Sequence, residues 1–359
     1  MTVSQGRRIR VLIADDSALM RQTLRQVIES DPELELIGVA RDGEDAVIKS
    51  RELRPDVLSL DINMPKLDGI SALQIVNSEQ ICPVVMVSSL TQKGAVATLE
   101  SLELGAFDFV AKPDGTVSSN LASVGAEIRI KLKAAAASGT LHRLKRPPSR
   151  ARTARREPAP ALEAKAVERA VAIGISTGGP ATLMDVLPRI QADAPAPFFL
   201  VQHMPPLFIH TFAQRLDEAC AIEVVEAEAG MITRPGVCYV APGDRQLTLF
   251  RKSDGSVVVR TPSQPETLFM PSVDVMMKSV LSVYGAGTIG VLMTGIGDDG
   301  AQQMVEITKA GGYTIAESQE SCIVYGMPRQ AIETGGAKVA VPSWDIADEI
   351  TLALKGGRR

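Results

Sequence analysis

A serine in a glycine-rich turn is the first residue whose setting could support chemistry. Ser176 lies in Gly174–Gly178, which has the spacing Gly-x-Ser-x-Gly and follows an apolar run. Small neighbours let a chain turn sharply from strand to helix and expose a serine hydroxyl at the sheet edge. The helix N-terminus at Thr177 and Gly178 offers N–H groups to an anion, such as an oxyanion. The motif is short, so a nucleotide-binding loop and a plain turn stay open, although no P-loop or dinucleotide fingerprint is present.

Histidines are scarce, which narrows the choice of a base for this serine. A serine at neutral pH needs a base, usually histidine, and the chain has only His142, His203 and His210. His142 lies in a proline- and arginine-rich stretch, and His210 falls about two helical turns after His203, on a helix surface. His203 directly follows the apolar run Phe198–Gln202, at the same predicted sheet edge as Ser176. We therefore prefer His203 as the base, with a structural role at a strand end as the alternative.

A third group is needed to orient this histidine. Asp298 and Asp299 lie in the glycine-rich turn Thr294–Gly300, after the predicted strand Thr288–Met293. Either aspartate could accept the ring N–H of His203, and both could instead cap the helix that follows. The residues alone leave this choice open. The order Ser, His, Asp differs from the α/β-hydrolase order Ser, Asp, His, so such a triad would be convergent.

A second set of reactive residues occurs near the N-terminus, at the ends of predicted strands. Asp15 and Asp16 follow the first apolar run, Asp61 the third and Lys112 the fifth, and Ser88 ends the fourth. Ligands of doubly wound sheets collect beyond the carboxyl ends of the strands. Carboxylates gathered there need a cation, and an all-oxygen set suits Mg²⁺. Each residue alone could be a helix cap, a turn residue or a surface lysine, but together they favour phosphoryl transfer to a carboxylate.

Alternating apolar and amphipathic segments must position these residues. In residues 1–137 the strand-like runs are Ile9–Ala14, Leu34–Ala40, Asp56–Leu60, Val84–Ser88 and Asp108–Ala111, and the helix-like stretches include Leu19–Ile28, Ile70–Asn77 and Ala95–Leu104. Alternation of apolar strands with helices predicts a parallel sheet covered on both faces. Five such units predict a doubly wound, flavodoxin-like α/β domain.

A similar series in residues 167–359 predicts a second doubly wound α/β domain. Its strand-like runs are Ala170–Ile175, Phe198–Gln202, Ile222–Val225, Thr288–Met293 and Lys338–Val341, with helices at Thr182–Ile190 and Val273–Leu281. Three β-rich runs between Val237 and Thr261 are separated by turn residues, which predicts an inserted antiparallel hairpin. Residues 138–166 are rich in Pro, Arg and Ala and predict a linker. A binding role for the linker arginines is the alternative.

The bulk composition agrees with this organisation. A chain of 359 residues suits two domains of about 100–200 residues. The net charge of −4 gives no field that would attract nucleic acid or anionic lipid, so neither is expected as a direct partner. Four scattered cysteines suggest no disulfide framework and no zinc cluster. Neither a signal peptide nor an apolar run of about 20 residues is visible, which favours a cytoplasmic protein.

The N-terminal residues carry a family resemblance. The segments IADDS, LDINMPKLDG, VMVSSLT and FDFVAKP resemble those of response-regulator receiver domains, over about residues 8–135. The resemblance implies phosphorylation of Asp61 by a CheA-type histidine kinase, with Mg²⁺ as cofactor. It also implies Asp15, Asp16, Asp61 and the backbone carbonyl of Asn63 as metal ligands, Ser88 as the switch hydroxyl, Phe109 as the switch aromatic residue and Lys112 as the phosphate-contacting lysine.

The C-terminal residues carry a second resemblance. The segments GISTGGP, VQHMPP, YVAPGDRQL, LMTGIGDDGA and VYGMPRQA resemble those of CheB-type protein-glutamate methylesterases, over about residues 168–354. This resemblance implies Ser176 as nucleophile, His203 as base and Asp299 as orienting acid, because the pattern TG-x-G-x-DG selects Asp299 over Asp298. It also implies an oxyanion-hole N–H at Ile296, where the family often has methionine.

Together the two resemblances imply a phosphorylation-activated serine hydrolase. Its substrates would be glutamate methyl esters of methyl-accepting chemoreceptors, and specific receptor glutamines would be deamidated. No cofactor is expected for ester hydrolysis, and the protein is expected to contact the membrane only indirectly, through the receptors. The receiver would block the catalytic face until phosphorylation of Asp61 pulls Ser88 and Phe109 inward. The alternative from the residues is a receiver-regulated DNA-binding or nucleotide-binding response regulator.

Overall fold

The computed structural model describes residues 7–89, 91–112, 121–138 and 168–356. The chain divides into two compact units, and each is described by itself below. The predicted linker 138–166 lies outside the described residues except for Ser138, which ends a helix. The linker and the domain boundaries therefore stay predictions.

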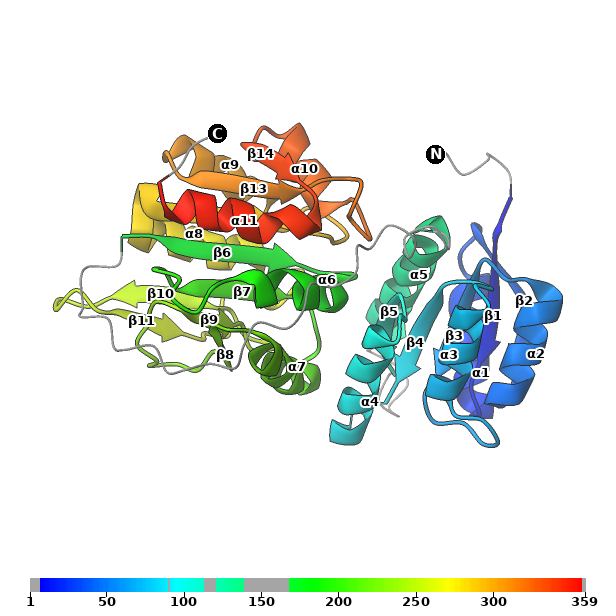
Figure 1. The fold of residues 1–359 in the computed structure, drawn as a ribbon. Coiled ribbons are helices and arrows are strands. Elements are labelled where there is room, and N and C mark those ends of the chain that lie inside the picture. The colour runs from blue at the N-terminus through cyan, green and yellow to red at the C-terminus, as the bar shows by residue number, and fades with distance from the viewer. Residues whose placement is uncertain (1–6, 90, 113–120, 139–167, 357–359) are drawn as a thin grey trace. The chain divides into compact units, whose positions relative to one another are not determined.

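The N-terminal unit is a five-stranded parallel sheet with helices on both faces (Figure 1). Its strands are β1 (Ile9–Ala14), β2 (Leu34–Ala40), β3 (Val57–Asp61), β4 (Val84–Ser88) and β5 (Asp108–Ala111), in the order β2-β1-β3-β4-β5. Its helices are α1 (Ala18–Glu29), α2 (Gly43–Leu53), α3 (Gly69–Ser78), α4 (Gln92–Glu103) and α5 (Leu121–Ser138). Helices α1 and α5 pack together on one face, and α2, α3 and α4 pack on the other. This flavodoxin-like order confirms the predicted fold.

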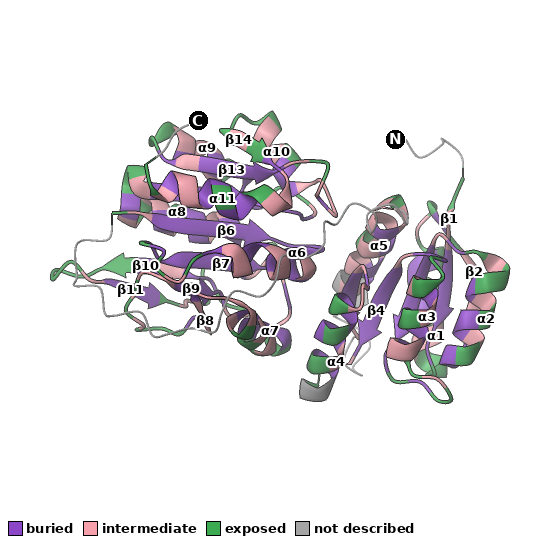
Figure 2. Ribbon diagram, viewed as in Figure 1, coloured by how far each residue is buried: buried purple, intermediate pink, exposed green. Residues whose placement is uncertain are grey.

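Local sequence explains why these elements begin where they do. Helices α1, α2, α3 and α4 start after Ser17, Asp42, Asp68 and Thr91, and each of these side chains accepts a backbone N–H of the first turn. Strands β3 and β4 are buried along their whole length (Figure 2). Burial on both faces is the reason that these strands appear in the sequence as continuous apolar runs.

The C-terminal unit is built on a seven-stranded parallel sheet. Its strands are β6 (Ala170–Ile175), β7 (Phe198–Gln202), β8 (Glu223–Glu226), β9 (Val237–Val240), β12 (Thr288–Leu292), β13 (Tyr313–Glu317) and β14 (Val339–Val341), in the order β14-β13-β12-β6-β7-β9-β8. Its longer helices are α6 (Gly179–Val186), α7 (Pro206–Ala219), α8 (Val273–Tyr284), α9 (Ala301–Lys309), α10 (Met327–Glu333) and α11 (Ser343–Leu354). Helices α6, α7 and α11 cover one face, and α8, α9 and α10 cover the other. The predicted doubly wound architecture is confirmed.

Two strand assignments in this unit differ from the sequence-based expectation. Of the three β-rich runs, only β10 (Thr248–Arg251) and β11 (Val257–Arg260) form the antiparallel pair. The first run is β9, which pairs parallel with β7 and β8, and all four of its residues are buried in the sheet. Strand β13 was not predicted, because polar Tyr313 and Glu317 at its two ends leave only a short apolar run between them.

All four cysteines are free. Within the described ranges, no helix is both long enough and apolar enough to pass through a lipid bilayer.

Candidate active site

Ser176 lies at the topological switch point of the C-terminal sheet, where the strand order reverses. It directly follows β6, and the chain places β7 on one side of β6 and β12 on the other. Crevices at such switch points, beyond the carboxyl ends of parallel strands, are the usual ligand sites of doubly wound sheets. The turn is tight because Gly178 adopts a positive φ of 75° before α6 begins. Ser176 itself is 9% exposed, so neighbouring residues enclose most of it.

His203 lies next to Ser176 across the sheet. Ile175 pairs with Gln202 in the register of β6 and β7, so Ser176 and His203 are the residues that follow this pair. The buried amide of Gln202 donates from Nε2 to the carbonyl oxygens of both residues, at 3.0 Å each. Gln202 therefore fixes the backbone of the two segments relative to each other. No hydrogen bond between the Ser176 hydroxyl and the His203 ring is present in the described structure, and such contacts often form only with substrate bound.

Asp299 lies against His203, whereas Asp298 is exposed. The Nε2 atom of His203 is 2.9 Å from Oδ2 of Asp299. The other ring nitrogen, Nδ1, is buried without a hydrogen-bond partner in the described structure. The ring of Phe269 stacks on the imidazole with centroids 4.4 Å apart and planes 10° apart. Phe269 thus shields one ring face and restricts the orientation of the histidine.

The carboxylate of Asp299 caps the N-terminus of α8. Its Oδ2 accepts the N–H of Val273 at 2.7 Å, and its Oδ1 accepts the Ser272 hydroxyl at 2.8 Å and the N–H of Asp274 at 2.9 Å. Burial raises the pKa of Asp299, but His203 and the N–H groups of Asp274 and Val273 outweigh burial, and the net pKa is lowered. The helix N-terminus also favours negative charge. Asp299 is therefore an ionised acceptor placed against a ring nitrogen of His203.

Backbone N–H groups surround the serine. In the described part of the chain, the N–H groups of Thr177, Gly178 and Ile296 donate to no acceptor. The loop that carries Ile296 touches the serine, because a Cβ added to Gly295 would lie 2.8 Å from Cβ of Ser176. Free N–H groups beside a nucleophile are the usual donors for a developing oxyanion.

The N-terminal unit brings its predicted carboxylates together. One carboxylate oxygen from each of Asp15, Asp16 and Asp61 lies within 4.8 Å of the others. Nζ of Lys112 pairs with Oδ2 of Asp15 at 2.9 Å and with Oδ2 of Asp61 at 2.8 Å. Asp61 is the last residue of β3, whereas the sequence placed it directly after the strand. All four residues lie at the carboxyl edge of the sheet, as predicted.

The electrostatics of this cluster suit a divalent cation. Burial raises the pKa of Asp61, as does the neighbouring Asp15, while Lys112 and the N–H of Asn63 lower it, and the net pKa is raised. Burial lowers the pKa of Lys112, but hydrogen bonding and attraction from Asp61 and Asp15 outweigh it and the net pKa is raised. Oδ1 of Asp61 is buried without a hydrogen-bond partner in the described structure. An unsatisfied buried carboxylate oxygen in an all-oxygen cluster fits Mg²⁺.

The remaining predicted residues of this unit lie nearby. Ser88 is buried at the end of β4, and its hydroxyl makes only a long contact, 3.5 Å, with the carbonyl of Ser89. Asn63 is exposed, two residues after Asp61. Phe109 is only 3% exposed, with Nζ of Lys131 5.2 Å from its ring centre. The ring of Phe109 is therefore enclosed in the described structure, and its role as the switch aromatic residue stays a prediction.

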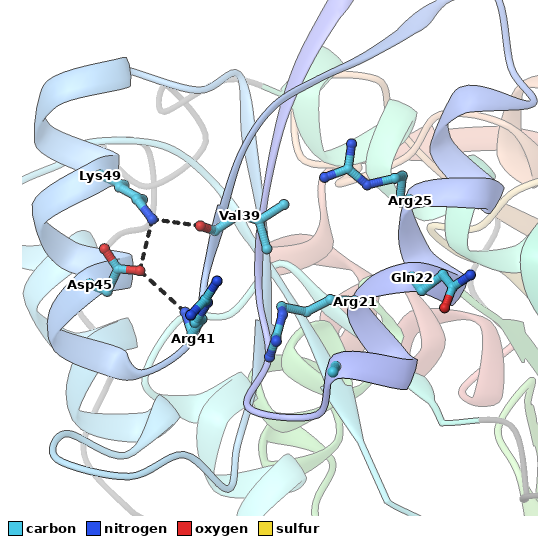
Figure 3. Close-up of a pocket in the computed structure, with 8 residues that line it drawn as sticks. Arg21, Gln22, Arg25, Val39, Arg41, Asp45 and Lys49 are labelled. Carbon is cyan, nitrogen blue, oxygen red and sulfur yellow. Dashed lines mark hydrogen bonds and ion pairs between the residues drawn. The ribbon is translucent and has the colours of Figure 1, made fainter.

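A pocket of about 550 Å³ in the N-terminal unit is lined in part by α1, which begins just after Asp15 and Asp16 (Figure 3). Its lining residues are Ala18, Arg21, Gln22, Arg25, Val39, Arg41, Asp45 and Lys49. The Arg21 guanidinium donates to the carbonyl oxygens of Asp15 and Asp16, at 2.8 Å each. Arg21 thus fixes the loop that carries two of the three carboxylates.

Several supporting residues were not found from the sequence. Ser272 could have been suspected, since it stands as an N-cap with an acidic residue, Asp274, in the first turn of α8. Gln202 and Phe269 gave no signal, because neither a glutamine that ends a strand nor an aromatic residue in a loop has a fixed motif. Their roles depend on which segments the fold brings side by side.

Comparison with known proteins places both units in families. Residues 171–350 match the CheB methylesterase family, and residues 11–118 match the response regulator receiver domain. The chain is 57% identical over 356 residues to protein-glutamate methylesterase/protein-glutamine glutaminase 3 of Syntrophomonas wolfei, covering 96% of this chain and 99% of the relative. It is 49% identical over 350 residues to the protein-glutamate methylesterase/protein-glutamine glutaminase of Caldanaerobacter subterraneus, covering 95% of each.

A solved structure agrees. The CheB methylesterase catalytic domain of Thermotoga maritima matches with 37% identity and a TM-score of 0.50, covering 52% of this chain and 97% of that one. A DNA-binding or nucleotide-binding output domain is not favoured, because the methylesterase match occupies that part of the chain. The chain therefore belongs to the CheB methylesterase family and joins a receiver domain to a methylesterase domain.

Proposed function

We propose that this chain is a phosphorylation-controlled serine hydrolase that removes methyl esters from glutamate side chains of chemoreceptors. The observation that carries the proposal is the contact of His203 with the ionised Asp299, one strand from Ser176. A histidine that donates one N–H to a carboxylate is prepared to accept a proton on its other nitrogen. The names of the relatives supply the class of substrate.

The first half of the reaction forms an acyl-enzyme. Oγ of Ser176 attacks the ester carbonyl carbon while Nδ1 of His203 takes the hydroxyl proton. The tetrahedral oxyanion accepts hydrogen bonds from the free N–H groups of Thr177, Gly178 and Ile296. Loss of one such donor costs about 10²–10³ in kcat in a known serine hydrolase. The bond between the carbonyl carbon and the methoxy oxygen then breaks, and methanol leaves with the proton from His203.

The second half restores the enzyme. His203 removes a proton from water, and the resulting hydroxide attacks the acyl carbon. The bond to Oγ breaks, Ser176 regains its proton from His203, and the product is a glutamate side chain. The same steps on a glutamine side chain release ammonia instead of methanol. We infer that this chain shares the glutaminase activity that its relatives' names state.

Control is proposed to come from the receiver domain. Asp15, Asp16, Asp61 and the backbone carbonyl of Asn63 would hold Mg²⁺, which would offset negative charge on an incoming phosphoryl group. Asp61 would accept the phosphoryl group from a CheA-type histidine kinase, and Lys112 would pair with the added charge. Ser88 has a hydroxyl without a short contact in the described structure, so it is free to turn toward the phosphoryl oxygen. These changes would release the catalytic face.

The substrate class is tested by measuring methanol after the chain is mixed with membranes that carry methylated chemoreceptors. We expect methanol release together with loss of methyl esters from the receptors, in the cytoplasm-facing segments. A small carboxylic ester serves as a second substrate. Hydrolysis of the small ester without any release from receptors would reject the substrate class and leave the hydrolase intact.

A further inference from the structure

One buried carboxyl group of the C-terminal unit has no part in the chemistry above. Glu317 ends β13, is 0% exposed, and lies two strands from β6 in the sheet. Burying a carboxyl group is costly unless its oxygens are hydrogen-bonded. Both oxygens of Glu317 are satisfied: Oε2 accepts the N–H of Thr294 at 2.8 Å, and Oε1 accepts the hydroxyl of Ser321 at 2.8 Å.

Thr294 connects this carboxyl group to the nucleophile. Thr294 is 0% exposed and is the second residue after the end of β12. Its carbonyl oxygen accepts the N–H of Ser176 at 2.9 Å, and its hydroxyl donates to the carbonyl of Thr177 at 3.0 Å. The same hydroxyl accepts the N–H of Val324 at 2.9 Å. Every polar group of Thr294 is therefore engaged, and two of its bonds reach the turn that carries the serine.

The loop after Thr294 is held in the same way. Gly295 donates to the carbonyl of Val324 at 3.1 Å, and its own carbonyl accepts the N–H of Met327 at 2.9 Å. Gly295 packs directly on Ser176, and Ile296 with its free N–H comes next. A shift of Thr294 would therefore displace both the serine and an oxyanion donor.

We propose that Glu317 is a positioning residue that fixes the nucleophile turn and the Ile296 loop through Thr294. This inference rests on the proposed function, since it assigns Glu317 to the geometry of the Ser176 reaction. Glu317 contacts neither the serine nor the histidine, and it acts only through the backbone of Thr294. Misplacement of a reacting group by about 1 Å can cost about 10²-fold in rate.

The chemistry of Glu317 indicates which substitute works. Burial raises its pKa, the N–H of Thr294 and the donors Ser321 and Cys322 lower it, and the net pKa is raised. A neutral carboxyl group can still accept from Thr294 with one oxygen while its O–H donates to the hydroxyl of Ser321. A glutamine reproduces both contacts, since its carbonyl accepts and its amide donates. Alanine reproduces neither.

The chain offers a matched control for a merely structural role. Glu349 is also buried, at 3% exposed, and accepts the hydroxyl of Tyr313 at 2.7 Å. Tyr313 begins β13, whereas Glu317 ends it. Glu349→Ala therefore removes a buried carboxyl group bonded to the same strand, at the end remote from Ser176.

The test compares Glu317→Ala, Glu317→Gln and Glu349→Ala with the wild-type full chain. Hydrolysis of p-nitrophenyl acetate gives kcat and KM, and urea unfolding gives stability. We expect Glu317→Ala to lower kcat by about 10–100-fold with KM changed less than about threefold. Glu317→Gln keeps kcat within about twofold, and Glu349→Ala loses stability but keeps its kcat.

The outcomes separate this inference from the proposed function. Equal kcat values for Glu317→Ala and wild type would overturn the inference while the hydrolase stands. A wild-type chain that cleaves neither the small ester nor the receptor ester would overturn both. Should Glu317→Ala not fold, Glu317→Met keeps a similar volume but cannot accept the N–H of Thr294, and an unchanged kcat in that variant would overturn the inference.

Discussion

His203 presents Nε2, not Nδ1, to Asp299: the Nε2–Oδ2 distance is 2.9 Å, and Nδ1 is buried without a partner in the described structure. Asp299 is ionised and accepts, so the neutral ring carries its proton on Nε2. Nδ1 is then the lone-pair nitrogen that takes the proton of Ser176 in the proposed mechanism. Ring orientation of this kind is set by the hydrogen bond that the opposite nitrogen makes.

The tautomer is open to direct measurement. We predict that long-range proton–nitrogen correlation spectra of the neutral His203 ring show a protonated Nε2 and an unprotonated Nδ1. Asp299→Ala removes the acceptor and is expected to give a mixture of tautomers. His210 is exposed on α7 and serves as an internal reference. A wild-type ring protonated on Nδ1 would contradict the proposed direction of proton transfer.

Asp299→Asn tests the orienting role of the carboxylate. The amide keeps the shape but can donate to the ring, which favours the wrong tautomer. We predict a fall in kcat of about 10²–10⁴-fold, since the corresponding change in a serine protease costs about 10⁴-fold. Asp298→Asn is the matched control, because Asp298 is the exposed neighbour. A similar loss in both variants would mean that the turn, and not the carboxylate, matters.

Asp299 also links stability to pH. The pKa of Asp299 is lower in the folded state than in the unfolded state. The ionised carboxylate therefore increases the free energy of unfolding at pH values above the unfolded pKa of about 3.9. This gain is lost as the pH falls through the lower, folded pKa. We predict that wild type loses stability over that acid range more steeply than Asp299→Asn. Urea unfolding at a series of pH values below about 5 measures this, and parallel curves would contradict it.

Asp61→Asn tests the control by phosphorylation. We predict that a small phosphodonor with Mg²⁺ raises the esterase rate of wild type and leaves the rate of Asp61→Asn unchanged. Basal rates of the two proteins are expected to agree within about twofold, since Asp61 lies in the other unit from Ser176. Chelation of Mg²⁺ is expected to abolish the activation and spare the basal rate. Equal activation of both proteins would reject Asp61 as the acceptor.

The sequence predicted the functional residues best where a reactive side chain lies at the end of an apolar strand. Buried parallel strands appear as apolar runs, so β1, β4, β6 and β7 were predicted with their observed bounds. Residues placed directly after such runs must meet at one sheet edge. This is why the carboxylate cluster could be assembled without coordinates.

The roles that the residue pattern alone did not assign depend on contacts between segments that are distant in the sequence. The pair Asp298 and Asp299 are neighbours in one turn, and only the approach of α8 and β7 distinguishes the buried from the exposed one. Gln202, Phe269 and Thr294 act through backbone groups or a ring face, which no spacing rule specifies. The first β-rich run after β8 was misassigned because a buried parallel strand and a hairpin strand have the same composition.

The most direct test of the central claim is methanol release from methylated chemoreceptors by wild type and by Ser176→Ala, at equal concentration and with folding checked by circular dichroism. We predict release by wild type and a fall of at least about 10³-fold in Ser176→Ala, since removal of the nucleophile of a triad costs up to about 10⁶-fold. Release at the wild-type rate by Ser176→Ala would contradict the assignment of a serine hydrolase.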